Sequence, residues 1–200
     1  MDNSVGAHAG RLQESMMAVF FAAGLTFAVV TLGYHMLGWL PAALFALGYV
    51  GGLLVWLWRS TRVSFRTIRV PYLVTLALFV VHKYEERTTD FFPALSGITG
   101  IPVPETTDPL VYVLYALASA WLLAPWLIWR GSEFGYFLAW SFFLSMGVTE
   151  LAHFLLPLLK KESYGYFPGM WSVIPLAPAA WWGVSRLWTG RGARWRLSAS

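Results

Sequence analysis

Long apolar stretches alternate with short polar breaks along most of the chain. A helix that crosses a bilayer needs about 20 mostly apolar residues. Six stretches meet this criterion, namely residues 16–36, 41–58, 71–88, 109–129, 134–159 and 168–188. Proline stands at the start of several of them, where it suits the first turn of a helix. The pattern predicts an all-α fold, a polytopic membrane helix bundle with about six transmembrane helices.

Positive charges predict how this bundle is oriented. With both termini in the cytoplasm, ten of the fourteen lysines and arginines lie on the inner side, including the four arginines between residues 59 and 69. The positive-inside rule expects such an excess on a cytoplasmic face. We therefore predict a cytoplasmic tail over residues 1–15, a single transmembrane bundle over residues 16–188 and a basic cytoplasmic tail over residues 189–200.

The composition supports a membrane location and excludes several other classes of protein. Of the 200 residues, 58% are hydrophobic and 12% are charged, whereas a typical soluble domain has about 25% charged residues. There is no cysteine, which excludes disulfides and thiolate ligands. The net charge of +4 arises from cations concentrated on the predicted cytoplasmic side of the membrane. We therefore expect membrane lipids as partners and no nucleic acid. The expected location is multi-pass in the cell (inner) membrane.

The longest polar break, residues 89–108, falls on the outer side of the predicted bundle. It is rich in glycine, proline and threonine, yet it contains the apolar cluster "FFPAL" at residues 91–95. Long structureless loops are uncommon in compact domains and often cover functional sites. We predict that this external loop forms a re-entrant or interfacial cap.

Ionisable residues gather within two of the apolar stretches at one depth. His82, Glu85 and Glu86 lie in the outer half of the third stretch, and Glu150 and His153 lie in the outer part of the fifth. An ionisable residue within a span costs several kcal/mol and usually has a function or a partner. Residues three and four apart share a helical face, so we expect both groups to point into the bundle and form one buried site.

The residue types at this site indicate metal binding or acid–base chemistry. The predicted metal ligands are His82, Glu85, Glu86, Glu150, His153 and His35, of which His35 lies near the outer end of the first stretch. Mixed imidazole and carboxylate ligands suit a divalent ion such as Fe, Zn or Mn. The predicted catalytic residues are His82, Glu86 and Glu150, and the predicted substrate-binding residues are Asp90, Phe92 and Tyr166. The substrate would be a lipophilic small molecule that enters between helices.

Structural explanations exist for some of these residues. Lys83, Glu86 and Arg87 also fit a helix end that leaves the lipid, with the long cations reaching toward water. His35, beside Tyr34, also fits an interfacial histidine. Glu150 is harder to explain in this way because its own stretch has no neighbouring cation.

Two motifs resemble those of a known family. "HKYEE" (82–86), followed by "DFFP" (90–93), resembles the signature of the HXXEE family of small bacterial integral membrane proteins. The similarity continues in His153 and in "YGYFPG" (164–169), which resembles the Tyr-x-Pro-Gly segment that opens the final helix in that family. Where the family pattern has an asparagine ahead of the later histidine, this chain has Glu150, which adds an anionic ligand. The resemblance implies a polar membrane site and does not specify a reaction.

A weaker resemblance is to the EXPERA class, which includes the sterol isomerase called emopamil-binding protein. It implies the alternative of a metal-free isomerase or cyclase of isoprenoid or sterol-like substrates. In that case Glu85 or Glu150 would act as a general acid and a histidine as base. A third alternative is a non-enzymatic pigment-binding or accessory membrane subunit. A homo-oligomer or a larger membrane complex is compatible with all three.

Overall fold

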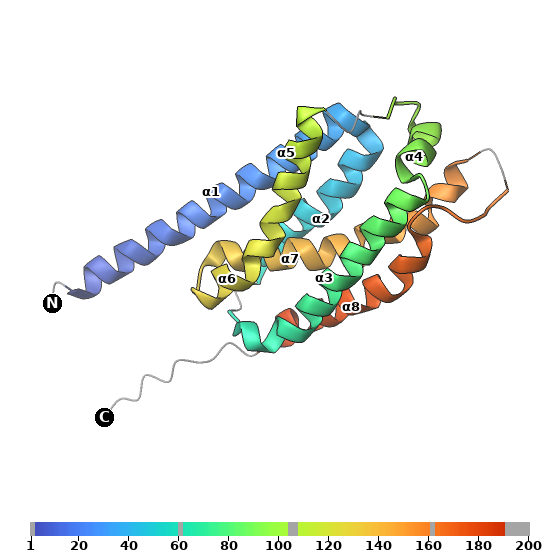
Figure 1. Ribbon diagram of the computed structural model, residues 1–200. Coiled ribbons are helices and arrows are strands. Elements are labelled where there is room, and N and C mark those ends of the chain that lie inside the picture. Colours follow the sequence, from blue (N-terminus) through green and yellow to red (C-terminus); the bar gives the residue numbers. More distant parts are fainter. Residues whose placement is uncertain (1–2, 60–61, 104–107, 161–162, 191–200) are drawn as a thin grey trace.

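The computed structural model describes residues 3–59, 62–103, 108–160 and 163–190, with side chains from residue 13 onward. This part of the chain is all-helical and contains no strand, which confirms the predicted fold class (Figure 1). The α-helices are α1 (Asn3–Leu37), α2 (Trp39–Trp58), α3 (Phe65–Thr88), α4 (Phe91–Thr99), α5 (Pro109–Ala118), α6 (Ala124–Trp129), α7 (Glu133–Gly147) and α8 (Met170–Thr189). Three 3₁₀ segments join them, namely η1 (Ser119–Leu123), η2 (Thr149–Phe154) and η3 (Leu156–Leu159).

Five helical segments of the described chain are long and apolar enough to cross a membrane, which indicates a membrane protein. They are Gln13–Leu37, Trp39–Trp58, Phe65–Thr88, Pro109–Trp129 and Glu133–Phe154. The sixth predicted span forms α8, which contains tryptophans, two internal prolines and Arg186 and is not among these five segments. A sixth span and the cytoplasmic location of both termini therefore remain predictions.

Two of the predicted spans are not continuous α-helices. Residues 109–129 divide into α5, η1 and α6, with a proline in the first turn of α6. Residues 134–159 divide into α7, η2 and η3, because Val148 leaves helical geometry at φ −123° and ψ −53°. The second break has a consequence for the site, since η2 carries Glu150 and His153.

Helix α7 forms the centre of the bundle. It packs against α1, α2, α3, α6 and α8, and 67% of its candidate span is buried, compared with 17–33% in the other four. Helices α2 and α7 approach closely at Gly52, where an added Cβ would lie 2.5 Å from the Ser141 Cα atom. Small residues permit such contacts between membrane helices. On the outer surface, Phe20, Phe27 and Leu54 are exposed, as expected of side chains that face lipid.

The two ends of the bundle differ in character. Figure 1 shows the start of α3 and the end of α8 at one end, and α4 with the start of α8 at the other. At the first end the Arg62 Nε atom donates to Glu133 Oε1 over 2.6 Å. The second end contains the predicted external cap, where α4 is the only helix in the described part of residues 89–108.

The predicted tails fall only partly within the described chain. Of the predicted N-terminal tail, residues 3–15 continue helix α1. Most of the predicted basic tail, residues 191–200, lies outside the described residues.

Candidate metal centre

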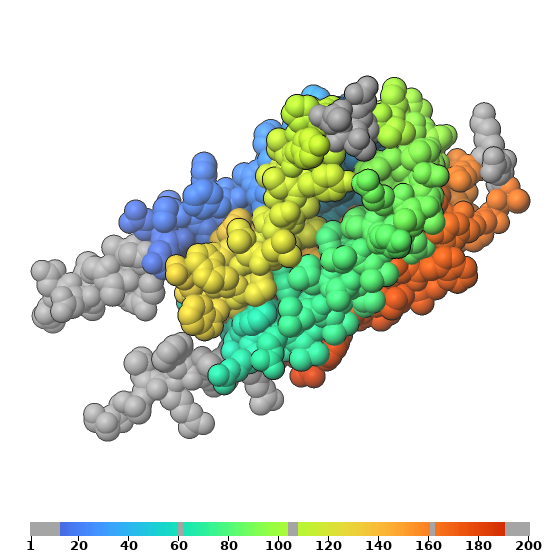
Figure 2. All heavy atoms as spheres, viewed as in Figure 1, coloured from blue at the N-terminus to red at the C-terminus, as the bar shows by residue number. Residues whose placement is uncertain are grey.

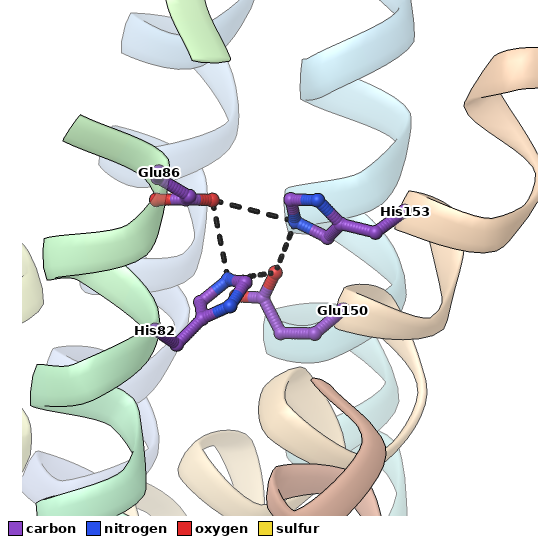
Figure 3. Close-up of side chains that lie close together, drawn as sticks. All are labelled: His82, Glu86, Glu150 and His153. Carbon is purple, nitrogen blue, oxygen red and sulfur yellow. Dashed lines mark hydrogen bonds and ion pairs between the residues drawn. The ribbon is translucent and has the colours of Figure 1, made fainter. Parts of the chain in front are cut away.

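Four ionisable side chains converge (Figure 3), at the end of the bundle that contains α4 and the start of α8. His82 and Glu86 belong to α3, and Glu150 and His153 belong to η2. One nitrogen or oxygen atom from each residue lies within 4.8 Å of those from the other three, so the group could hold a metal ion. The side chains of His82 and His153 are 0% and 3% exposed, and those of Glu86 and Glu150 are 9% and 12% exposed. We call this group the His/Glu cluster.

Local backbone geometry places each pair on one face. In an α-helix, residues four apart differ by about 40° in direction, so His82 and Glu86 point the same way from α3. In a 3₁₀-helix, which has three residues per turn, residues three apart eclipse one another. The change from α7 to η2 therefore aligns Glu150 with His153 more closely than a continuous α-helix would. The Trp181 Nε1–H bonds the Gly147 carbonyl at 2.8 Å and so satisfies an acceptor left at the end of α7.

The four inward-facing atoms form a closed ring of nearly equal separations. His82 Nε2 lies 3.2 Å from Glu86 Oε1 and 3.2 Å from Glu150 Oε2. His153 Nε2 lies 3.3 Å from Glu86 Oε1 and 3.2 Å from Glu150 Oε2. Each imidazole nitrogen is thus almost equally close to two carboxylate oxygens. Each carboxylate oxygen is likewise shared by two imidazoles.

The outer nitrogens of the two imidazoles are bonded to the turn that precedes α8 and to its first turn. His153 Nδ1 lies 2.5 Å from the Pro168 carbonyl oxygen, which can only accept, so Nδ1 carries the hydrogen. The Ser172 hydroxyl donates to the Gly169 carbonyl at 3.1 Å and therefore accepts from His82 Nδ1 at 2.8 Å. With both imidazoles neutral, both Nε2 atoms present lone pairs to the cluster. Such outer partners fix the tautomer and orientation of metal-binding histidines in proteins.

Gly169 holds this turn directly against both rings. Its φ is +92°, in the left-handed region, which favours glycine. An added Cβ would lie 2.6 Å from His153 Cε1 and Nδ1 and 2.9 Å from His82 Cε1. The space between backbone and imidazoles therefore admits no side chain.

The donor set fits a divalent metal ion. With neutral imidazoles, two lone-pair nitrogens and two carboxylate oxygens converge, and they repel one another unless a cation or protons lie among them. Charge-assisted N–H···O bonds are usually about 2.7–2.9 Å long, shorter than the 3.2–3.3 Å found here. In a tetrahedral site with bonds of about 2.0–2.1 Å, ligand atoms are about 3.3–3.4 Å apart. Four of the six ligand separations thus match the edges of a tetrahedral site better than they match hydrogen bonds, and all six lie within 4.8 Å.

Lys83 lies at the edge of the cluster. Its Nζ atom donates to Glu86 Oε2 at 2.6 Å and lies 3.8 Å from Glu150 Oε1. These are the carboxylate oxygens turned away from the imidazoles. The Lys83 side chain is 41% exposed, so it connects the buried carboxylates to the surface of the bundle.

Glu85, a predicted metal ligand, lies outside the cluster. Its carboxylate accepts hydrogen bonds from the backbone N–H groups of Ser172, at 2.8 Å, and Trp171, at 3.2 Å. It also accepts from the Tyr166 hydroxyl at 2.7 Å. Glu85 and Glu86 are consecutive on α3 and so point about 100° apart. The carboxylate of Glu85 therefore stabilises the N-terminus of α8, where free N–H groups and the helix dipole favour an anion.

Tyr166, a predicted substrate-binding residue, takes part in the contact between Glu85 and the segment that leads into α8. Partial burial, together with the Glu85 carboxylate, raises the pKa of the Tyr166 hydroxyl above its usual value. The hydroxyl therefore remains a neutral donor. It ties the turn before α8 to α3.

The other predicted site residues do not belong to the group of four. His35 is exposed on α1, where its ring contacts Tyr34 at 5.8 Å between centroids. Asp90 is exposed and starts α4 with a φ of 61°. Phe92 lines a small cavity between α4 and the end of α1. The ring of its neighbour Phe91 contacts the His153 ring, at 5.2 Å between centroids.

Sequence reasoning missed the residues that orient the imidazoles, above all Ser172. This serine is an ordinary residue in the first turn of an apolar helix, 90 positions from its partner His82. The only available signal was the Pro168–Gly169 turn in the motif that resembles the HXXEE pattern.

Comparisons of the chain with protein-family models, with curated proteins and with solved structures found no match.

Proposed function

We propose that this protein is an integral membrane enzyme that binds one divalent metal ion at the His/Glu cluster and acts on a lipophilic substrate. His82, Glu86, Glu150 and His153 would hold the ion, and Fe, Zn and Mn suit this mixture of nitrogen and oxygen ligands. The observation that supports the proposal best is the ring of four ligand separations of 3.2–3.3 Å. The fixed orientation of both imidazoles supports it independently.

The residues around the ion would perform the remaining tasks. A divalent ion supplies a Lewis acid that polarises an oxygen atom of a substrate or of water. The hydrogen bonds to Pro168 and Ser172 would keep both imidazoles in place. Lys83 would hold the outer carboxylate oxygens and stand between the cluster and an incoming molecule. The apolar outer surface of the helices makes a lipid-soluble substrate the natural choice.

Metal analysis of the protein purified in detergent tests this proposal. We expect about one tightly bound ion per chain in the unaltered protein and a loss of most of it in Glu150→Gln. The matched control is Glu85→Gln, which removes a charge from a glutamate that bonds α8 and should retain the ion. An unaltered protein that takes up no Fe, Zn or Mn would contradict the proposal.

The second candidate is a metal-free acid–base enzyme, such as an isomerase or cyclase. It is supported by the same carboxylate–imidazole pairs, which could pass protons between Glu150 and either histidine at 3.2 Å. This candidate predicts no bound ion, together with a proton-transfer activity that Glu150→Gln abolishes. The same metal analysis therefore separates the two candidates.

A pigment-binding role has less support. The imidazole centroids of His82 and His153 are 4.8 Å apart and the rings are nearly perpendicular, which leaves no room for a porphyrin between them. Both Nε2 atoms also face carboxylates. Membership of the HXXEE family, an inner-membrane location and assembly into an oligomer or larger complex remain predictions.

A further inference from the structure

Lys83 covers the edge at which the His/Glu cluster approaches the surface. The imidazoles are 0% and 3% exposed, the carboxylates 9% and 12%, and the Lys83 side chain 41%. Its Nζ atom contacts the outer oxygen of Glu86 and faces that of Glu150. An ammonium has three N–H donors. Lys83 uses one of them in its short hydrogen bond to Glu86, so donors remain for another group.

The charges around this edge favour an anion once a metal ion is bound. Two carboxylates, one ammonium and two neutral imidazoles leave a net charge of −1. A divalent ion would change it to +1. Glu85 does not offset this charge, because its carboxylate is bonded to the N-terminus of α8. Unbalanced charge is costly in a low-dielectric interior, so a single negative charge next to Lys83 would be stabilised.

The surroundings of Lys83 favour an apolar chain attached to that charge. The Nζ atom lies 5.4 Å from the centre of the Phe79 ring. Val80 and Tyr84, on the same helix, are 62% and 69% exposed. Figure 2 shows α3 on the surface, flanked by α5 and α6 on one side and by α8 on the other. A molecule that reaches Lys83 from the lipid would therefore pass over apolar and aromatic side chains.

Resting on the proposed metal-dependent function, we propose that the substrate is an amphiphile whose head group is a monoanionic oxyanion, and that Lys83 binds this head group. The apolar tail would lie along the exposed surface of α3. The inference goes beyond the proposed function because it specifies the charge of the substrate and a residue that recognises it. In this role Lys83 contacts the substrate, whereas the four ligands hold the ion.

A binding experiment with cobalt-loaded protein tests this assignment without an activity assay. The protein would be placed in phosphatidylcholine nanodiscs, loaded with Co²⁺ and titrated with decanoate while its visible absorption is recorded. Decanol is the neutral probe of equal chain length, and acetate is the charged probe without a tail. Lys83→Met removes the ammonium and Lys83→Arg retains a cation. Lys160→Met is the matched control. It removes a lysine that follows η3 and lies over the Phe167 ring.

We expect decanoate to perturb the cobalt spectrum at concentrations at least about tenfold lower than either decanol or acetate. Lys83→Met should weaken decanoate binding by about tenfold or more, as expected for loss of a charge-assisted hydrogen bond. Lys83→Arg should retain most of the affinity, and Lys160→Met all of it. Equal binding by decanol, or unchanged decanoate binding in Lys83→Met with full cobalt content, would overturn this inference and leave the metal site intact. Failure of the unaltered protein to bind Co²⁺ would overturn both proposals.

Discussion

Replacing Gly169 with alanine should damage the metal centre although Gly169 donates no ligand. The new Cβ would lie 2.6 Å from two atoms of the His153 ring and 2.9 Å from His82 Cε1. An ordinary contact needs at least 3.4 Å, so the His153 ring or the backbone must move by about 0.8 Å. The φ of +92° adds strain of about 1–2 kcal/mol for a residue with a side chain.

The two effects lead to separate measurable results. Strain and overpacking together should lower the free energy of unfolding by about 2–5 kcal/mol. If the protein relaxes by moving the imidazoles, metal affinity should fall by about 10–100-fold, as for other changes to the partners of metal-binding histidines. Affinity would be measured by competition with a chromogenic chelator, and stability by thermal unfolding in detergent with and without the metal ion.

Gly165→Ala is the matched control, because Gly165 lies in the same segment before α8 and its Cβ would meet nothing closer than the Ser163 carbonyl at 3.9 Å. It should keep the affinity and stability of the unaltered protein. Gly169→Ala protein with unaltered metal affinity would refute the reasoning, since it would show that the turn does not position the imidazoles.

Three further substitutions test neighbouring parts of the account. Ser172→Ala removes the acceptor of His82 Nδ1–H and should lower metal affinity about tenfold, measured by chelator competition; an unchanged affinity would contradict the assigned tautomer. Glu85→Gln removes the anion at the N-terminus of α8 and should lower thermal stability by about 1–2 kcal/mol with full metal content, whereas loss of the ion would show that Glu85 is a ligand. Gly52→Ala should separate α2 from α7 at Ser141 and destabilise the bundle by several kcal/mol, which unfolding in detergent would reveal; unaltered stability would contradict the close contact.

The general character of the site follows from sequence because helical spacing and membrane depth are simple constraints. His82 and Glu86 are four residues apart, and this spacing placed them correctly on one face of α3. The same depth argument brought Glu150 and His153 to the level of this pair. Burying such groups in a span without a partner is costly, so their convergence was the expected solution.

The finer geometry depends on contacts that local patterns do not contain. Periodicity could not show that α7 ends before Thr149 and that the following 3₁₀ turn aligns Glu150 with His153. Nor could it show that Glu85 faces away from Glu86, because the partner of Glu85 is a helix N-terminus more than 80 residues later. The sequence predicts His35 at the same depth as the other ligands, but depth does not specify the direction of a side chain, and His35 is exposed on α1.

The central claim is that two imidazoles and two carboxylates hold one metal ion, and X-ray absorption at the edge of the bound metal tests it most directly. We expect only nitrogen and oxygen neighbours at about 2.0–2.1 Å, with the outer scattering pattern of two imidazoles. Replacing either His82 or His153 with alanine should remove one imidazole from that pattern or abolish binding of the ion. A spectrum with no imidazole contribution, or one that neither substitution alters, would contradict the claim.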